Sequence, residues 1–162
     1  MFNRSDRRRI VAVALSGALL AGCGSIPADS DGTLDRARDG TLVVGVSEHP
    51  PWTSVGADGE VTGTEADLIT GFASSIGAEV QWHAGPESVL AGVMKEGGLD
   101  VMIGGLTSEA PWSDKMALTR SYAAVPTEAG QMQNMVMGVR LGENALMVAL
   151  ERYLAQEHGE LR

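Results

Sequence analysis

The sequence has 162 residues, with 12 Lys and Arg residues against 21 Asp and Glu residues, and its formal net charge is −9 at pH 7. Such an acidic balance argues against nucleic acid or an anionic lipid surface as a partner, because both are negatively charged. The length is that of one domain.

The first residues predict export. Arg4, Arg7, Arg8 and Arg9 form a basic region, and an apolar run from Ile10 to Leu20 follows it. This pattern is typical of a signal peptide. The apolar run is shorter than the roughly 20 residues that a membrane-spanning helix needs, so a signal peptide is favoured over a membrane helix.

The residues L-A-G-C, which end at Cys23, follow this run. They resemble the lipobox of bacterial lipoproteins, in which the cysteine is lipidated and becomes the first mature residue. The resemblance implies a signal peptide over 1–22, a lipid on Cys23 and a location in the cell envelope, with the domain facing the periplasm or the exterior. A plain secretory signal with a free cysteine is the alternative. Removal of residues 1–22 takes away four arginines and one aspartate, so the formal charge changes from −9 to −12.

The following chain alternates between two hydrophobic periodicities. Residues 23–33 are small and polar and predict a flexible tether. Helices are expected over 34–39, 65–76, 86–96 and 143–156, strands over 41–46, 78–83 and 99–103, and a tail over 157–162. In the helix over 86–96, Val89, Leu90, Val93 and Met94 are expected to be buried.

Consecutive strand–helix–strand units give parallel strands with helices on the faces of the sheet. The sequence therefore predicts an α/β layer domain over 34–156. Ligands of open sheets of this kind bind beyond the carboxyl ends of the strands. Here those ends lead into residues 47–52 and 104–107.

Three stretches carry a resemblance to a family: LVVGVSEHPPW with the later GTEADL, GGLDVMIGGLTSEAPWSDKMALTRSYA, and MVMGVRLGENALMVALERYL. They resemble, in order, the first strand and helix, the third strand with its loop, and the C-terminal segment of bacterial periplasmic solute-binding proteins of the amino-acid-binding type. These are the family 3 binding proteins of ABC transporters. The resemblance covers residues 34–124 and 134–156.

The family has two lobes joined by two hinge strands, with the ligand held between the lobes. In this sequence only about a dozen residues lie where the second lobe would be inserted. The resemblance therefore implies a single lobe with a mostly parallel sheet and helices on both faces. The two former hinge strands, which include AAV and MVMGV, would be joined by the short turn PTEAGQ.

Loop chemistry and the resemblance together suggest ligand-binding residues at the carboxyl ends of the strands. An aromatic face at Trp52 suits an amine, although a tryptophan that caps the sheet edge is an equal alternative. Glycines permit close backbone approach, and the following residues offer an amide and a hydroxyl. The candidates are Glu48, Trp52, Glu65, Gly105, Leu106, Thr107, Glu109 and Trp112.

One departure from the family concerns the loop after the third strand. In amino-acid binders this loop resembles T-x-E-R, and its arginine grips the carboxylate of the ligand. Here the place of that arginine falls near Trp112, and Arg120 lies too far along to be its equivalent. Glu109 and Trp112 suit a cationic or apolar group, and equally a protein surface that buries aromatic anchors.

Other chemistry finds no support in the sequence. His49, His83 and His158 lack metal-ligand spacing, and adjacent Ser47, Glu48 and His49 do not make a catalytic triad. The glycines form neither a phosphate loop nor a dinucleotide fingerprint. We therefore expect a protein without cofactor, metal or catalytic activity.

The resulting hypothesis is a membrane-anchored substrate-binding lipoprotein, or a single-lobe derivative of one, of an ABC-type import system. It would bind a small polar or cationic solute, such as an amino acid or amine, without covalent chemistry. A permease or a second copy of the chain could complete the cleft. The alternative is an interaction or sensor module that binds a partner protein through the former ligand face.

Overall fold

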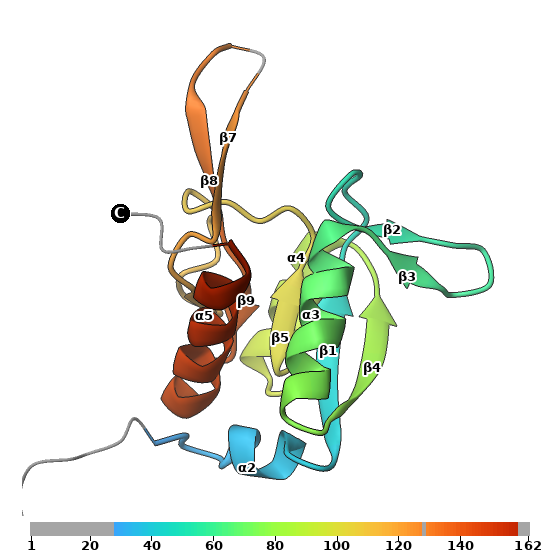
Figure 1. The fold of residues 1–162 in the computed structure, drawn as a ribbon, viewed down its shortest axis with the longest axis vertical. Coiled ribbons are helices and arrows are strands. Elements are labelled where there is room, and N and C mark those ends of the chain that lie inside the picture. The colour runs from blue at the N-terminus through green and yellow to red at the C-terminus, as the bar shows by residue number, and fades with distance from the viewer. Residues whose placement is uncertain (1–27, 128, 159–162) are drawn as a thin grey trace, which may run out of the picture.

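The computed structural model describes residues 28–127 and 129–158. Its centre is a five-stranded sheet in the order β4-β1-β5-β9-β6 (Figure 1). The strands of this sheet are β1 (Thr41–Val46), β4 (Glu79–Ala84), β5 (Val101–Ile103), β6 (Ala117–Leu118) and β9 (Gly138–Val139). The helices are α2 (Thr33–Ala37), α3 (Thr64–Ser75), α4 (Glu87–Lys95) and α5 (Asn144–His158). Two hairpins consist of β2 (Ser54–Val55) with β3 (Val61–Thr62), and β7 (Ala123–Pro126) with β8 (Met132–Met135).

The sheet is mostly parallel, as the sequence predicts. β1 pairs in parallel with β4 on one side and with β5 on the other, and β9 is antiparallel to both β5 and β6. The apolar run of β1 fits this central place, because strands with both faces covered are hydrophobic at nearly every position. The fold is therefore the predicted single α/β lobe.

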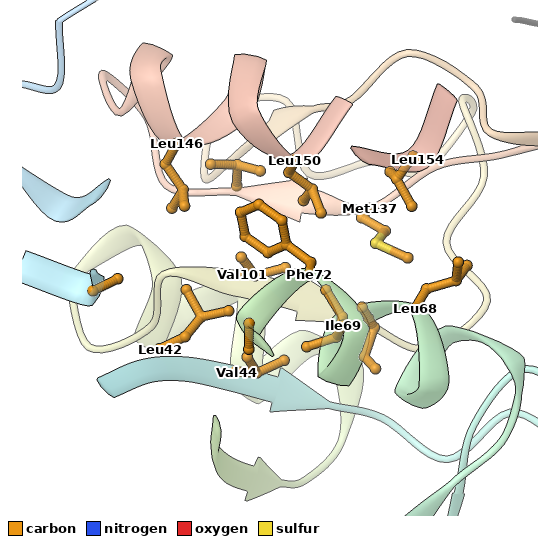
Figure 2. Packing of buried hydrophobic residues seen from close by; sticks show 14 of the residues in the cluster. Leu42, Val44, Leu68, Ile69, Phe72, Val101, Met137, Leu146, Leu150 and Leu154 are labelled. Carbon is orange, nitrogen blue, oxygen red and sulfur yellow. The ribbon is translucent and has the colours of Figure 1, made fainter. Parts of the chain in front are cut away.

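Helices cover both faces of the sheet. On one face, Ile69 and Phe72 of α3 and Leu150 of α5 pack on the strands, as Figure 2 shows. Side chains of β1 that point to this face include Leu42 and Val44, both fully buried. On the other face, α4 packs against a second buried cluster, which comprises Leu90, Ala91, Met94, Leu99, Met102, Leu106, Met116 and Val136.

The expected burial of Val89 in α4 is wrong, because this side chain is 56% exposed. The helix turns Leu90, Ala91 and Met94 toward the sheet, and Met94 lies three and four positions after the other two, as one helical face requires. Val89 precedes this stripe on the solvent side.

The N-terminal part of the domain is attached to α5 rather than free. The Asp29 carboxylate accepts the N–H of Leu34 at 2.7 Å, of Ala145 at 2.6 Å and of Leu146 at 3.0 Å. One aspartate therefore satisfies backbone donors at the beginnings of both α2 and α5, where donors have no partner within the helix. The flexible tether predicted for 23–33 thus does not extend through residues 29–33.

Glu143 strengthens the same attachment. Its carboxylate is buried and accepts the N–H of Asp31 at 3.0 Å and of Thr33 at 3.1 Å. Burial opposes ionisation of this group, but hydrogen bonds from Thr33 and Asp31 and the charge of Arg140 outweigh burial and lower the pKa of Glu143. The carboxylate is therefore held ionised at neutral pH.

β7 and β8 form an antiparallel hairpin that projects from the body of the lobe (Figure 1). The register runs from the pair Ala123 and Met135 to the pair Pro126 and Met132. In the turn, the N–H of Thr127 donates to the carbonyl of Gln131 at 2.8 Å, and Gly130 has a φ of 75°. The two former hinge strands are thus joined directly by a short turn, as predicted.

The predicted signal peptide and Cys23 lie outside the described residues. Within the part of the chain that the structure describes, no helix is both long enough and apolar enough to cross a membrane.

Candidate functional site

Two loops meet at the carboxyl ends of β1 and β5. A Cβ atom at Gly104 would lie 1.9 Å from Oγ of Ser47, and one at Gly105 would lie 2.8 Å from Cγ of His49. The same Cβ at Gly105 would lie 3.1 Å from Cδ1 of Trp52. Both glycines also have positive φ values, 146° and 68°, which other residues rarely adopt. The structure therefore brings the predicted residues Gly105 and Trp52 into contact, and this contact depends on glycine.

Glu65 lies beneath these loops, at the beginning of α3. Its side chain has no exposed surface. Oε2 accepts the N–H groups of Gly104 at 2.8 Å and Gly105 at 3.0 Å, and Oε1 accepts the hydroxyl hydrogen of Tyr122 at 2.6 Å. Both carboxylate oxygens are therefore used inside the protein, and Glu65 holds the Gly104–Gly105 loop instead of presenting a charge at the surface.

Burial shifts the titration of this pair. Removal from water raises the pKa of Glu65, while hydrogen bonds from Tyr122, Gly105 and Gly104 and the charge of His49 oppose the shift. Burial and the neighbouring Glu65 carboxylate raise the pKa of the Tyr122 hydroxyl. The hydroxyl thus stays protonated and remains a donor to Glu65.

Trp52 is half-buried and packs against the larger hydrophobic cluster. Its N–H donates to the carbonyl of His49 at 2.9 Å, and its carbonyl accepts the N–H of Glu65 at 3.0 Å. Trp52 thus packs on the core below the loop and retains some exposed surface. Contact with a solute stays a prediction.

Trp112 is oriented by the beginning of α4. Its Nε1–H donates to Oε1 of Glu87 at 2.5 Å, and Nζ of Lys115 lies 4.8 Å from the ring centroid. The indole also packs against the cluster beneath α4. At the place where amino-acid binders resemble T-x-E-R, this chain therefore has an indole whose one polar group is already bound.

The other candidates of the loop after β5 lie in different environments. Leu106 is buried, and its carbonyl accepts the N–H of Val136 at 3.0 Å. Thr107 is half-buried and its backbone pairs with Met135, whereas Glu109 is exposed. Leu106 is therefore a core residue in this structure.

A groove of about 540 Å³ lies between the ends of β1 and β4 and the beginning of α4. Its lining comprises Val46, Ser47, Glu48, His49, Val55, Ala84, Gly85, Pro86 and Glu87. This volume is within the roughly 300–1,000 Å³ of ordinary small-molecule sites. The lining has two carboxylates, Glu48 and Glu87, and neither lysine nor arginine, so the groove suits a cation.

A smaller hollow of about 190 Å³ lies between the loop after β5 and the β7–β8 hairpin, and Thr107 and Glu109 belong to its lining. The eight predicted residues therefore do not converge on one hollow. Glu48 lines the larger groove, Thr107 and Glu109 line the smaller one, and Trp52 contacts Gly105 between the two loops.

A sequence profile of the bacterial extracellular solute-binding proteins, family 3, matches residues 42–159. The chain belongs to this family. Members of the family are described as extracellular solute-binding proteins. Among curated proteins, none matches the chain in sequence.

Solved structures agree with this fold. The arginine-bound form of domain 1 from TmArgBP has a TM-score of 0.65 and 23% identity, with 75% of this chain and 97% of that chain covered. An ancestral cationic amino acid solute-binding protein has a TM-score of 0.66 and 13% identity, with 76% and 93% covered. A Salmonella typhimurium periplasmic binding protein with high arginine specificity has a TM-score of 0.63 and 10% identity, with 74% and 94% covered. The match to domain 1 identifies this family 3 chain as a single lobe.

Sequence reasoning missed Glu87 as part of the site. This residue begins α4, directly after Pro86, where an acidic residue is favoured by the helix dipole alone. No local pattern distinguishes such a residue from one that binds a tryptophan. The link to Trp112 spans 25 residues and exists only in the folded chain.

Among the described residues, no group of three or more His, Cys, Asp or Glu side chains is placed to hold a metal ion.

Proposed function

We propose that the protein is a membrane-anchored substrate-binding lipoprotein, or a single-lobe derivative of one, that serves an ABC-type import system and binds a small cationic solute. Family membership supports the solute-binding part of this proposal. The observation that carries the choice of a cation is the groove at the ends of β1 and β4, which has two carboxylates and no lysine or arginine in its lining.

The cationic preference has physical support. Glu48 is exposed at the groove, and the chain has a net charge of −9, so an approaching cation is attracted over a long range. The similar structures include proteins named for arginine or for cationic amino acids. A carboxylate paired with a guanidinium or ammonium makes a charge-assisted hydrogen bond, which is stronger than a neutral one.

The anchor is the second part of the proposal. Cys23 would carry the lipid, and residues 24–28 would connect it to Asp29, where attachment to α5 begins. Metabolic labelling with a palmitate analogue tests this part in bacteria that express the chain. Label on the protein and its loss in Cys23→Ser are expected, whereas label on both forms, or on neither, would overturn lipidation at this residue.

Isothermal calorimetry of the full chain in detergent tests solute binding. The panel is arginine, lysine, putrescine and glutamate, so charge varies while size stays similar. Saturable heat with at least one cation and none with glutamate is expected. Glu48→Gln should weaken that binding, and Glu60→Gln, a change of an exposed carboxylate outside the groove, should not. Preference for glutamate, or equal affinity in Glu48→Gln, would contradict the proposal.

An interaction or sensor module is the second candidate. The projecting β7–β8 hairpin favours it, because Met132 is 63% exposed there and a partner could bury this side chain. If no compound of the panel gives binding heat, and if sedimentation shows concentration-dependent dimers, this candidate is favoured over the solute-binding one.

A further inference from the structure

The hollow of about 190 Å³ beneath the β7–β8 hairpin is built by segments far apart in the sequence. The backbone of Thr107 pairs with Met135, and the N–H of Ser108 donates to the carbonyl of Asn134 at 3.0 Å. The loop after β5 therefore runs along β8 like a third strand. This pairing fixes the two walls of the hollow relative to each other.

The lining of this hollow is almost entirely polar. The loop contributes Thr107, Ser108 and Glu109, and the hairpin contributes Thr127 and residues 131–134, which read Gln, Met, Gln and Asn. Hydroxyl and amide oxygens accept hydrogen bonds, and the Glu109 carboxylate adds a negative charge. Since the lining has no lysine, arginine or histidine, an anion would find no partner charge, whereas a group with several N–H donors and a positive charge would.

The size of the hollow limits what it can hold. A volume of about 190 Å³ is below the roughly 300–1,000 Å³ of sites that enclose a whole small molecule. The groove at the ends of β1 and β4 is larger, about 540 Å³. The hollow therefore fits a charged end group better than a complete solute.

Two hydrogen bonds at the turn brace the hairpin wall. The N–H of Thr127 donates to the carbonyl of Gln131 at 2.8 Å, and the N–H of Gln131 donates to Oγ1 of Thr127 at 3.2 Å. Pairing of β7 with β8 continues from this turn to Met135. A fixed wall loses little freedom when a ligand binds, which favours binding.

We propose that this hollow is a binding subsite for the guanidinium or ammonium end of a solute, in which the β7–β8 hairpin serves as the wall opposite the loop that carries Glu109. The proposal rests on the proposed function for the existence of a cationic solute. It adds that residues of the hairpin, and not only those of the β1 and β5 loops, contact the solute. A single lobe thus provides two walls to one end of its ligand.

Calorimetry with agmatine, which has a guanidinium and an ammonium group and no carboxylate, tests the subsite on the full chain in detergent. Glu109→Gln keeps the shape of the side chain and removes its charge, and it should weaken agmatine binding at least tenfold. Gln133→Ala should also weaken binding. The matched controls Glu96→Gln and Gln156→Ala change exposed residues outside the hollow and should leave binding unaltered.

The outcomes separate this proposal from the proposed function. Suppose that Glu48→Gln weakens agmatine binding, whereas Glu109→Gln and Gln133→Ala leave it unchanged. This result would overturn the subsite and keep the solute-binding function. Absence of binding by the unaltered chain to every cation tested would overturn both. As an independent measurement, side-chain amide resonances of Gln131, Gln133 and Asn134 should shift in NMR spectra when agmatine is added. Unshifted resonances at saturation would contradict the contact.

Discussion

The hydroxyl group of Tyr122 donates a hydrogen bond of 2.6 Å to Oε1 of Glu65 inside the lobe, although the two residues are 57 positions apart in the sequence. Tyr122 directly precedes β7, the first strand of the hairpin, and Glu65 is the second residue of α3. The other oxygen of Glu65 holds Gly104 and Gly105. One carboxylate thus connects the first long helix, the loop after β5 and the base of the hairpin.

Glu65→Ala should reduce the free energy of unfolding by about 3 kcal/mol or more, because it removes the acceptor of three hydrogen bonds in a buried place. Urea denaturation followed by tryptophan fluorescence measures this loss. Tyr122→Phe removes the hydroxyl that donates to the buried Glu65 and should cost about 1–3 kcal/mol. If Glu65→Ala costs no more than Tyr122→Phe, the bonds to the two glycines contribute little to stability.

The pH dependence of stability should contain a contribution from Glu65 with a defined sign. Since burial raises its pKa above the ordinary value of 4.5, the folded chain retains a proton that the unfolded chain has lost. Stability from this group is fully present below the ordinary pKa and falls as pH rises through the raised pKa. The difference in unfolding free energy between the unaltered chain and Glu65→Gln should therefore decrease as pH rises above the ordinary pKa of 4.5.

Denaturation series at each pH give this difference directly, and Glu143→Gln is the control with the opposite sign. Because the pKa of Glu143 is lowered, its contribution is present above the ordinary pKa and is lost as pH falls. Parallel pH profiles for the two variants would show that these groups do not titrate as the buried geometry requires.

Gly105→Ala should destabilise the loop over Glu65 for two reasons. The residue has a φ of 68°, and a Cβ would lie 2.8 Å from Cγ of His49, so the ring must move. Gly130→Ala is the matched control, because Gly130 has a similar φ of 75° and a Cβ there would have nothing within 4 Å.

Thermal unfolding followed by circular dichroism compares the two glycine variants. We expect about 1 kcal/mol of destabilisation from backbone strain in Gly130→Ala and at least about 1 kcal/mol more in Gly105→Ala. Equal losses would mean that the His49 and Trp52 side chains yield without cost.

Much of the fold could be predicted, because the central elements have local patterns. TLVVGV is apolar throughout, as a strand covered on both faces must be, and it is β1. β6 could not be found this way, since it has two residues and exists only through its pairing with β9, about 20 residues later. The β2–β3 hairpin has a turn at Asp58 and Gly59 that is typical of hairpins, but its strands are too short to show alternation.

The site was less predictable, because it depends on contacts between distant segments. The sequence predicts that Glu65 could present a carboxylate to a ligand, whereas in the structure this carboxylate accepts the N–H groups of Gly104 and Gly105 inside the protein. Its complete burial could not be foreseen, since an acidic residue in the first turn of a helix is ordinarily solvated. Leu106 likewise lies in a loop by sequence and in the core by packing.

Asp29→Ala should destabilise the lobe by about 1–2 kcal/mol, because the carboxylate serves as a cap for donors of both α2 and α5. Asp29→Asn keeps an acceptor oxygen and should restore part of the loss. Urea denaturation measures both variants. No change in Asp29→Ala would show that water replaces the carboxylate at these helix ends without cost.

The attachment of Asp29 to α5 also orders events during biosynthesis. Asp29 and Leu146 are 117 residues apart, so their hydrogen bond cannot form until nearly all of the described lobe has been made. Contacts of such long sequence separation close late and slow the folding of a small domain. A nascent chain therefore cannot complete its N-terminal attachment until α5 has been synthesised.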